Sequence, residues 1–213
     1  MRLYFKPGSC SLSSRIALIE IGLAHDAIRV DTETGLTETG DAYHAVNPKG
    51  YVPALELDDG SVLTENPAIL QFLADGHPQA ALAPAYGTVE RARLQEWLNF
   101  TSSELHKSFS PYFRGYPLGE AEKEQVEGRL ARRVGDVERG LADGRDFILG
   151  GGFTVADAYL FVVLNWSGFI GLDLARWPHV AAYVTRIATR PSVRDAMRRE
   201  GLITDKIAEE AAE

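Results

Sequence analysis

Cysteine is almost absent from the chain, whose 213 residues include only Cys10. A single cysteine excludes an intramolecular disulfide, and a thiol kept for chemistry suits a reducing compartment, so we expect a cytoplasmic protein. The position three residues further on holds Ser13, which excludes an internal dithiol cycle as well. Any thiol exchange therefore needs a thiol from another molecule.

Long hydrophobic runs and an excess of basic residues are missing too. The longest apolar stretch, Ala158 to Leu164, is far shorter than the roughly 20 residues that span a bilayer, and no signal-peptide pattern opens the chain. The 30 acidic side chains outnumber the 22 basic ones, for a net charge of -8. This balance argues against a nucleic acid as the main partner. We expect a globular protein that binds neither membrane nor nucleic acid.

The first third of the chain alternates between strand-like and helix-like patterns. Apolar residues alternate in the strand candidates and recur at helical spacing in the helix candidates. In chain order we expect a strand at 2–5, a helix at 14–22, a strand at 27–31, a hairpin of 54–57 with 62–64, and a helix at 68–75. The order βαβ followed by ββα predicts an α/β domain over residues 1–78.

Strand signals end at the segment 79–87, whose proline and glycine residues indicate a linker. Beyond it, helical length or periodicity marks residues 88–113, 120–141, 155–170, 178–189 and 193–200. We therefore expect an all-helical bundle over 88–213, with a tail from residue 204 that frays. Thr154 and Asp157 form a capping box before the most apolar helix, which makes Asp157 a folding residue.

Cys10 lies in a serine-rich turn between the first expected strand and the first expected helix. Unpaired backbone N–H groups and the positive end of the helix dipole favour a thiolate there. A lone cysteine is often a small buried hydrophobic residue instead, but four neighbouring serines make a poor apolar pocket. We therefore interpret Cys10 as a reactive cysteine.

Two further patterns each have two interpretations, as a ligand site or as an ordinary structural feature. A cis bond between Val52 and Pro53 would leave backbone groups open to an extended ligand, although a trans loop proline is the commoner case. Glu65 and Asn66 begin a helix, where a carboxylate and free N–H groups suit the two charges of an α-amino acid. A plain helix cap is the simpler account of this second pattern.

The segment 96–111 carries a polar stripe at helical spacing. At about 100° per residue, the stripe contains Asn99, Ser103, His106 and Ser110. Lys107 borders the stripe, whereas Glu104 points away from it. These uncharged polar side chains suit the wall of a polar cleft, but an exposed helix surface is an equally good account of the periodicity.

With these residues in view, the chain resembles cytosolic glutathione transferases of the bacterial, cysteine-containing beta class. The resemblance runs from YFKPGSCSLS through NPKGYVPALELDDG and LTENPAI to LQEWLNFTSSELHKSFSP and FTVADAYLFVVL. It implies a thioredoxin-like N-terminal domain before the all-helical domain, and a homodimer. It also implies glutathione as co-substrate, no metal, and an apolar electrophile bound beside the glutathione.

The resemblance carries roles over to particular residues. Val52, before a cis Pro53, would pair with the cysteinyl part of glutathione, and Glu65 with Asn66 would hold its γ-glutamyl head. The glutathione sulfur would lie close to Cys10, the N–H donors around Ser11, and His106. Asn99 and Lys107 would lie nearby, while Ser103 and Glu104 would reach toward the partner subunit's site. Related sequences often hold the glycyl carboxylate with a lysine, but residues 32–42 contain no basic side chain.

The implied activity is conjugation of glutathione to hydrophobic electrophiles. A thiolate at Cys10 would repel a glutathione thiolate in the same pocket, which favours thiol-disulfide exchange or peroxide reduction as a side activity. The alternative is a non-catalytic ligand-binding or partner-docking protein, because a fold does not fix a function. Nothing in the sequence identifies the electrophile.

Overall fold

The structure is a computed structural model that describes residues 1–204; the rest of the tail expected to fray lies outside the described residues. Contacts between Cα atoms divide the chain into two compact units. One unit comprises Met1–Leu82 together with residues 189–204, and the other comprises Ala83–Ala188. The domain boundaries expected from the sequence differ from this division in one respect, the place of the last helix.

The first unit is built on a five-stranded sheet with the order β3-β2-β1-β4-β5. Its strands are β1 (Arg2–Phe5), β2 (Asp26–Asp31), β3 (Leu36–Thr37), β4 (Ala54–Glu56) and β5 (Val62–Thr64). β1 runs parallel to β2 and antiparallel to β4, so that Leu3 lies opposite both Ala27 and Leu55. The sequence missed β3 because two residues are too few to produce an alternating pattern.

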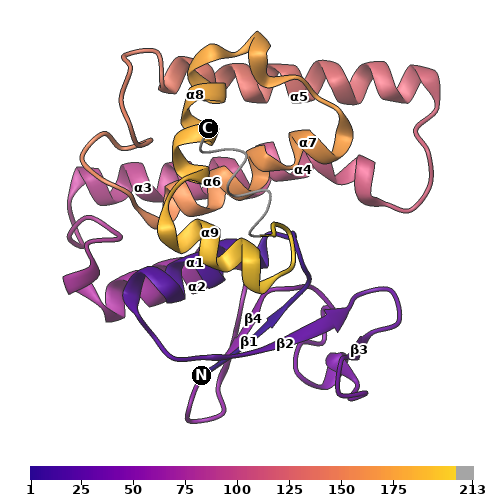
Figure 1. The fold of residues 1–213 in the computed structure, drawn as a ribbon, viewed down its shortest axis with the longest axis vertical. Helices are drawn as coiled ribbons and strands as arrows, with labels where there is room; N and C mark the ends of the chain where they lie inside the picture. Colours follow the sequence, from indigo (N-terminus) through magenta and orange to yellow (C-terminus); the bar gives the residue numbers. More distant parts are fainter. Residues whose placement is uncertain (205–213) are drawn as a thin grey trace. The chain divides into compact units, whose positions relative to one another are not determined.

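The described residues of this unit include three α-helices: α1 (Ser11–Ile21), α2 (Asn66–Gly76) and α9 (Pro191–Arg199). α1 contacts both α2 and α9, and Figure 1 shows α1 and α2 side by side. Successive side chains of β1 point to opposite faces of the sheet. Tyr4 packs with Val30 and Tyr43 on one face, while Leu3 is buried on the other, so the sheet has an apolar core on each face. The unit is the expected thioredoxin-like domain.

α9 is held in the first unit by polar contacts to α1. The Arg190 guanidinium lies 2.8 Å from Glu20 Oε1, and Ser192 Oγ donates to the same oxygen. From the sequence, this segment was expected to belong to the helical domain. Local sequence patterns do not reveal these contacts, because they join residues about 170 positions apart in the chain. Hydrophobic periodicity shows that a helix exists, but it does not show what the helix packs against.

The second unit is entirely helical in the structure. Its α-helices are α3 (Val89–Phe100), α4 (His106–Phe109), α5 (Glu120–Gly140), α6 (Val155–Asn165), α7 (Ser167–Ile170) and α8 (Pro178–Ala188). A π-helical segment, Thr101–Leu105, joins α3 to α4. Single 3₁₀ turns occur at Ser110–Phe113 and Leu174–Arg176 here, and at Tyr43–Ala45 and Pro78–Ala80 in the first unit. The expected all-helical bundle is confirmed.

α6 is the buried centre of this bundle, as the sequence predicts. Every residue from Val155 to Leu164 is buried, and α6 contacts both α3 and α8. The expected capping box is present at its start, where Thr154 donates its backbone N–H to Asp157 Oδ2 at 2.8 Å. Over residues 1–204, no helix is both long and apolar enough to cross a membrane.

Candidate functional site

The loop before β4 presents backbone groups to solvent. The Val52–Pro53 peptide bond is cis, as the resemblance implies. Tyr43 Oη and Asn47 Nδ2 each donate to the Tyr51 carbonyl at 2.7 Å, which fixes the loop from behind. Within residues 1–204 the Val52 N–H donates to no acceptor, so it is open to an extended ligand.

The Cys10 thiol lies against this loop. Its Sγ donates to the Val52 carbonyl at 3.4 Å, and the residue is 9% exposed. The helix α1 begins at Ser11, three residues earlier than predicted, so Cys10 immediately precedes it and its sulfur lies at the positive end of the helix. The Val52 carbonyl favours the protonated sulfur, which opposes the effect of the helix end. The structure therefore brings Cys10 and Val52 together, with Cys10 as a hydrogen-bond donor.

The serines around Cys10 are structural links and do not form a solvated pocket. Ser11 is fully buried, and its Oγ donates to the Lys6 carbonyl at 3.3 Å. Ser13 Oγ accepts from Asn66 Nδ2 at 2.8 Å, and Ser14 Oγ donates to Asn66 Oδ1 at 2.7 Å. The side chains of Ser11 and Asn66 are thus occupied within the protein. The Ser11 N–H also donates to Ser9 Oγ at 3.3 Å, so of these two residues the backbone of Asn66, at the start of its helix, remains for a ligand.

Glu65 immediately precedes α2 and has an unusual backbone conformation. Its φ is +68°, in a region that non-glycine residues rarely adopt, and such outliers concentrate at functional sites. Its carboxylate lies 2.6 Å from Lys49 Nζ, but both side chains are more than half exposed. Exposed pairs of this kind contribute little to stability. The Glu65 carboxylate is therefore available to a ligand cation beside the helix start.

The turn from β2 to β3 has no basic residue of its own, but a lysine from β1's end reaches it. Lys6 Nζ donates to Thr32 Oγ1 at 3.0 Å. The ring of His44 lies close to Gly35, where an added Cβ would stand 3.4 Å from His44 Cδ2. Lys6 and His44 thus lie at this turn, where related sequences often have a lysine.

The C-terminal segment holds the loop before Cys10, a feature that sequence reasoning missed. Gly8 donates its N–H to Glu200 Oε2 at 2.9 Å, and a Cβ on Gly8 would stand 3.4 Å from Leu202. Glu200 Oε1 also lies 3.2 Å from Arg15 Nε, with both side chains almost fully buried. These two atoms lack hydrogen-bond alignment, so the pair recovers only part of the cost of its burial. Burial raises the pKa of Glu200 to about 7, against the opposing effects of Gly8 and Arg15.

We expect this carboxylate to make the protein less stable as the pH rises from about 5 to about 8. The pKa of Glu200 is higher in the folded state than its ordinary value of 4.5. The contribution of Glu200 to the free energy of unfolding is therefore fully present below the unfolded-state pKa and is lost as the pH rises through the folded-state pKa. The change is at most about 3.5 kcal/mol, since one pKa unit corresponds to about 1.4 kcal/mol and the folded-state pKa lies about 2.5 above the ordinary value.

Urea unfolding at a series of pH values measures this effect. The control is Glu200→Gln, which keeps an acceptor for Gly8 but does not titrate. The variant should show a flatter dependence of unfolding free energy on pH. Equal slopes for the two proteins would contradict the role of Glu200.

In the second unit, the π-helical segment breaks the polar stripe expected over 96–111. The N–H of His106 bonds to the carbonyl of Thr101, five residues back, where an α-helix would use the residue four back. The extra residue rotates the helix after the segment relative to the part before it. The prediction of a single polar stripe at 100° per residue was therefore wrong. Asn99 and Ser103 are exposed, whereas the His106 ring turns inward.

The other expected polar residues of this segment lie at the surface. Ser103 Oγ donates to the Asn99 carbonyl at 2.9 Å, and Lys107 is exposed. The Glu104 carboxylate lies 2.5 Å from Arg133 of α5, with 45% of its side chain exposed. Ser103 and Glu104 thus have contacts within their own chain.

The His106 ring lies in an aromatic cluster that the sequence did not predict as a site. The ring centroid of Trp166 is 4.7 Å away in an edge-to-face arrangement, and Tyr159 Oη lies 2.8 Å from His106 Nδ1. Phe109 and Phe113 pack on Trp166, and Phe113 is 51% exposed. Burial lowers the pKa of His106 to about 4, and the Lys107 charge adds to the shift. The cluster therefore offers a neutral imidazole beside an apolar surface.

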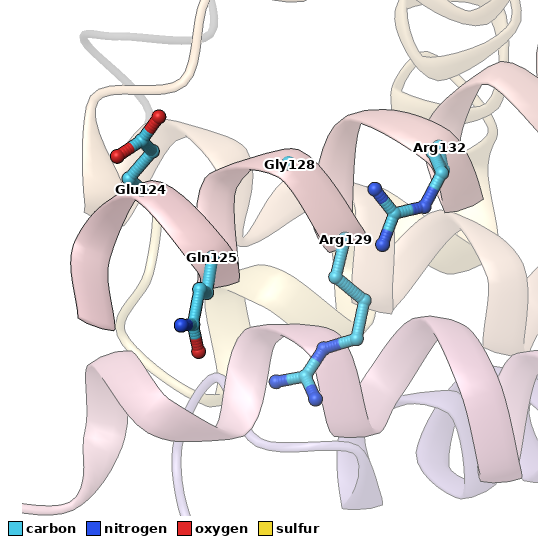
Figure 2. A pocket seen from close by; sticks show the side chains of 5 residues that line it. All are labelled: Glu124, Gln125, Gly128, Arg129 and Arg132. Atoms are coloured by element: carbon cyan, nitrogen blue, oxygen red, sulfur yellow. The ribbon is translucent and has the colours of Figure 1, made fainter. Parts of the chain in front are cut away.

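One surface hollow is lined by none of these residues. It has a volume of about 640 Å³ and is lined by Glu124, Gln125, Gly128, Arg129 and Arg132. Figure 2 shows that all five belong to one helix, α5. The hollow contains none of the predicted site residues. In the part of the chain that the structure describes, no group of three or more His, Cys, Asp or Glu side chains could hold a metal ion.

Comparisons with known proteins agree with this geometry. The chain matches the model "Glutathione S-transferase, N-terminal domain" over residues 8–75 and the model "Glutathione S-transferase, C-terminal domain" over residues 120–186. It is 46% identical over 202 residues to Glutathione S-transferase GstA of Escherichia coli O157:H7, which covers 95% of this chain and 100% of that protein.

Two solved structures are similar over nearly the whole chain. The bacterial beta-class glutathione S-transferase of Sphingomonas chungbukensis is 47% identical with a TM-score of 0.91, over 95% of this chain and 100% of that one. A sphingomonad glutathione S-transferase complexed with glutathione is 43% identical with a TM-score of 0.89, over the same shares. Both domain matches and these structural neighbours confirm the predicted resemblance. The chain belongs to the glutathione S-transferase family, and its structural neighbours include a bacterial beta-class glutathione S-transferase.

Proposed function

We propose that this glutathione transferase conjugates glutathione to small hydrophobic electrophiles, and that Cys10 adds a thiol-exchange activity. The observation that carries the proposal is the short distance of 3.4 Å between the Cys10 sulfur and the Val52 carbonyl, beside an open Val52 N–H. A cysteinyl peptide that pairs with Val52 would bring its own sulfur close to Cys10. The glutathione complex of a similar enzyme supports this choice of ligand.

In this proposal, glutathione binds in an extended form on the first unit. The Val52 backbone pairs with the cysteinyl residue, as a strand edge pairs with a peptide. The Glu65 carboxylate receives the α-ammonium of the γ-glutamyl head, and the Asn66 N–H at the start of α2 receives its carboxylate. The unusual φ of Glu65 supports a binding role, because strain of this kind persists where function requires it.

Conjugation requires donors that stabilise the glutathione thiolate. A protonated Cys10 can turn its S–H from Val52 to that thiolate, which removes the repulsion between two thiolates. A neutral His106 is the second proposed donor, with Asn99 and Lys107 nearby. Aromatic side chains such as Phe113 supply the apolar wall for the electrophile. Ser103 and Glu104 reach a partner subunit's site in the proposed homodimer.

The exchange activity begins when Cys10 loses its proton to solvent. Its thiolate attacks the glutathione sulfur of a mixed disulfide between glutathione and a substrate thiol, so that a bond forms between that sulfur and Cys10. The disulfide bond of the substrate breaks, and the substrate leaves as a thiolate that takes up a proton. A free glutathione thiolate then attacks the glutathione sulfur on Cys10, so that glutathione disulfide leaves and the Cys10 thiolate takes up a proton. The cysteine-poor sequence and a reducing, cytoplasmic location fit this cycle.

We expect Cys10→Ala to abolish the glutathione adduct and to reduce conjugation only in part. The adduct forms only at Cys10, because the chain has no other thiol. Conjugation keeps the other donors and should lose about three- to thirtyfold in kcat/KM, which is the effect of one or two hydrogen bonds. Intact mass after incubation with glutathione disulfide measures the first result, and turnover of 1-chloro-2,4-dinitrobenzene measures the second.

The same experiment separates the enzyme from a non-catalytic protein on this fold. Wild-type protein retained on glutathione-agarose but without turnover of several electrophiles would favour a binding protein. Turnover without any adduct on Cys10 would keep the conjugating function and remove the exchange activity. Cys10→Ser, which keeps a donor of similar size, should retain more conjugation than Cys10→Ala.

A further inference from the structure

The immediate surroundings of the His106 ring determine which of its nitrogens carries the proton. Tyr159 Oη lies 2.8 Å from Nδ1, and the Tyr159 ring meets the imidazole nearly at right angles, with an interplanar angle of 82°. Trp166 closes a second side of the ring with an interplanar angle of 77°. Tyr159 and Trp166 are only 2% and 5% exposed, so both contacts are held by the core of the helical unit.

His106 is neutral at physiological pH in this environment. Burial lowers its pKa to about 4, and the charge of Lys107 acts in the same direction. A neutral imidazole has one N–H donor and one bare nitrogen acceptor. The hydrogen bond at one nitrogen therefore decides what the other can do.

The chemistry of the two groups gives this hydrogen bond a direction. A phenol O–H is a strong donor and its oxygen is a weak acceptor, whereas a bare imidazole nitrogen is a strong acceptor. The bond at 2.8 Å is consequently stronger when Tyr159 donates and Nδ1 accepts. The proton of the imidazole must then be on Nε2.

We propose that Tyr159 is a positioning residue, which donates its hydroxyl to Nδ1 of His106 and so holds the imidazole with its proton on Nε2. This inference rests on the proposed function for the role of His106 at the glutathione sulfur. In that role His106 acts as a hydrogen-bond donor to the thiolate and does not accept the glutathione proton. The sulfur proton leaves to solvent, and the Nε2–H remains in place throughout the reaction.

The test of the tautomer uses the free protein and needs no glutathione. Protein labelled with ¹⁵N-histidine is examined near neutral pH, and the His106 signals are assigned by their loss in His106→Gln. We expect a proton bound directly to Nε2 and none on Nδ1 in the wild type. In Tyr159→Phe the ¹⁵N shifts of both nitrogens should move toward an average of the two tautomers. A wild-type proton on Nδ1, or unchanged shifts in Tyr159→Phe, would overturn the proposal.

A second buried tyrosine provides the matched control. Tyr183 is fully buried in the same unit and donates to Asp157 Oδ1 at 3.0 Å. Tyr183→Phe should lower the thermal midpoint but leave the His106 shifts unchanged. If Tyr183→Phe also moved those shifts, the effect of Tyr159→Phe would be a general loosening of the unit, and the proposal would fail.

Kinetics then test the consequence for the reaction. We expect Tyr159→Phe to lower kcat about three- to tenfold with little change in KM for glutathione, the effect of one weakened hydrogen bond. Unchanged kcat in Tyr159→Phe, despite a changed tautomer, would overturn the role of Tyr159 in the reaction. Absence of turnover in the wild type would instead contradict the proposed function, while the ¹⁵N result would still stand.

Discussion

Asp157→Ala should lower the free energy of unfolding by about 3 to 5 kcal/mol, because the substitution removes a buried charge that accepts several hydrogen bonds. The Asp157 side chain is fully buried. Its Oδ1 accepts from the Ile148 N–H at 2.7 Å and from Tyr183 Oη at 3.0 Å, and its Oδ2 accepts from the Thr154 N–H and Oγ1 at 2.8 Å. Alanine would leave these donors buried without an acceptor.

Each of these donors belongs to a different part of the second unit. Ile148 precedes α6, Thr154 is its N-cap, and Tyr183 lies on α8. The carboxylate therefore joins a loop, a helix start and a neighbouring helix at one point. Asp157→Asn keeps the volume but replaces one acceptor oxygen with an NH₂ group that faces donors, so we expect a loss nearly as large.

Urea unfolding with a fitted midpoint and slope measures these losses. The matched control is Asp173→Ala, because Asp173 is an exposed aspartate that accepts from the Ala175 N–H at 2.8 Å at a helix start. Removal of this exposed cap should cost about 1 kcal/mol or less. Equal losses for Asp157→Ala and Asp173→Ala would show that burial of the hydrogen-bonded carboxylate does not account for the effect of Asp157 on the free energy of unfolding.

The fold was largely predictable because most of its elements carry local signals. The capping box before α6 and the apolar run of α6 predicted the centre of the bundle, and the alternation of Leu3 with Tyr4 predicted β1. The π-helical segment carries no such signal, because the residues from Thr101 to Leu105 also suit an α-helix. The contact of Arg15 with Glu200 depends on tertiary packing, which periodicity does not describe.

The site was predictable to a smaller extent, and mainly where a role depends on the backbone. Turn and helix-start chemistry located Cys10 before α1 and Glu65 before α2, whereas the cis Pro53 came from the family resemblance, because the residues alone favour a trans proline. The surroundings of His106 were not predictable, because Tyr159 lies 53 residues away in a run that looks like ordinary core. The same holds for Ser11, whose side chain turned out to be an internal link.

Glu65→Gln should weaken glutathione binding by about 2 to 5 kcal/mol, or from about thirtyfold to several thousandfold in Kd. The variant keeps the size and backbone of residue 65 but removes the charge that we propose for the α-ammonium of the ligand. That ammonium would lie in a partly covered site without a counter-charge, which is the costly case. Folding should be unaffected, because the Glu65 side chain is 64% exposed and its pair with Lys49 is a surface pair.

Lys49→Gln is the control on the other half of that pair. Lys49 Nζ lies 2.6 Å from the Glu65 carboxylate and occupies the place that the ligand ammonium is proposed to take. Removal of this lysine should leave glutathione binding unchanged or slightly tighter, because the ligand then has no competitor. A large loss of affinity in Lys49→Gln would show that the lysine itself binds the ligand.

A ligand without the α-amino group decides whether Glu65 acts through the proposed contact. Isothermal titration of both proteins with glutathione and with its deaminated analogue gives a double-mutant cycle, with one change in the protein and one in the ligand. If the carboxylate and the ammonium pair, wild type should bind the analogue far more weakly than glutathione, whereas Glu65→Gln should bind the two with similar affinity. Additive losses would mean that Glu65 acts through the backbone at the start of α2, and the γ-glutamyl head would then need another partner.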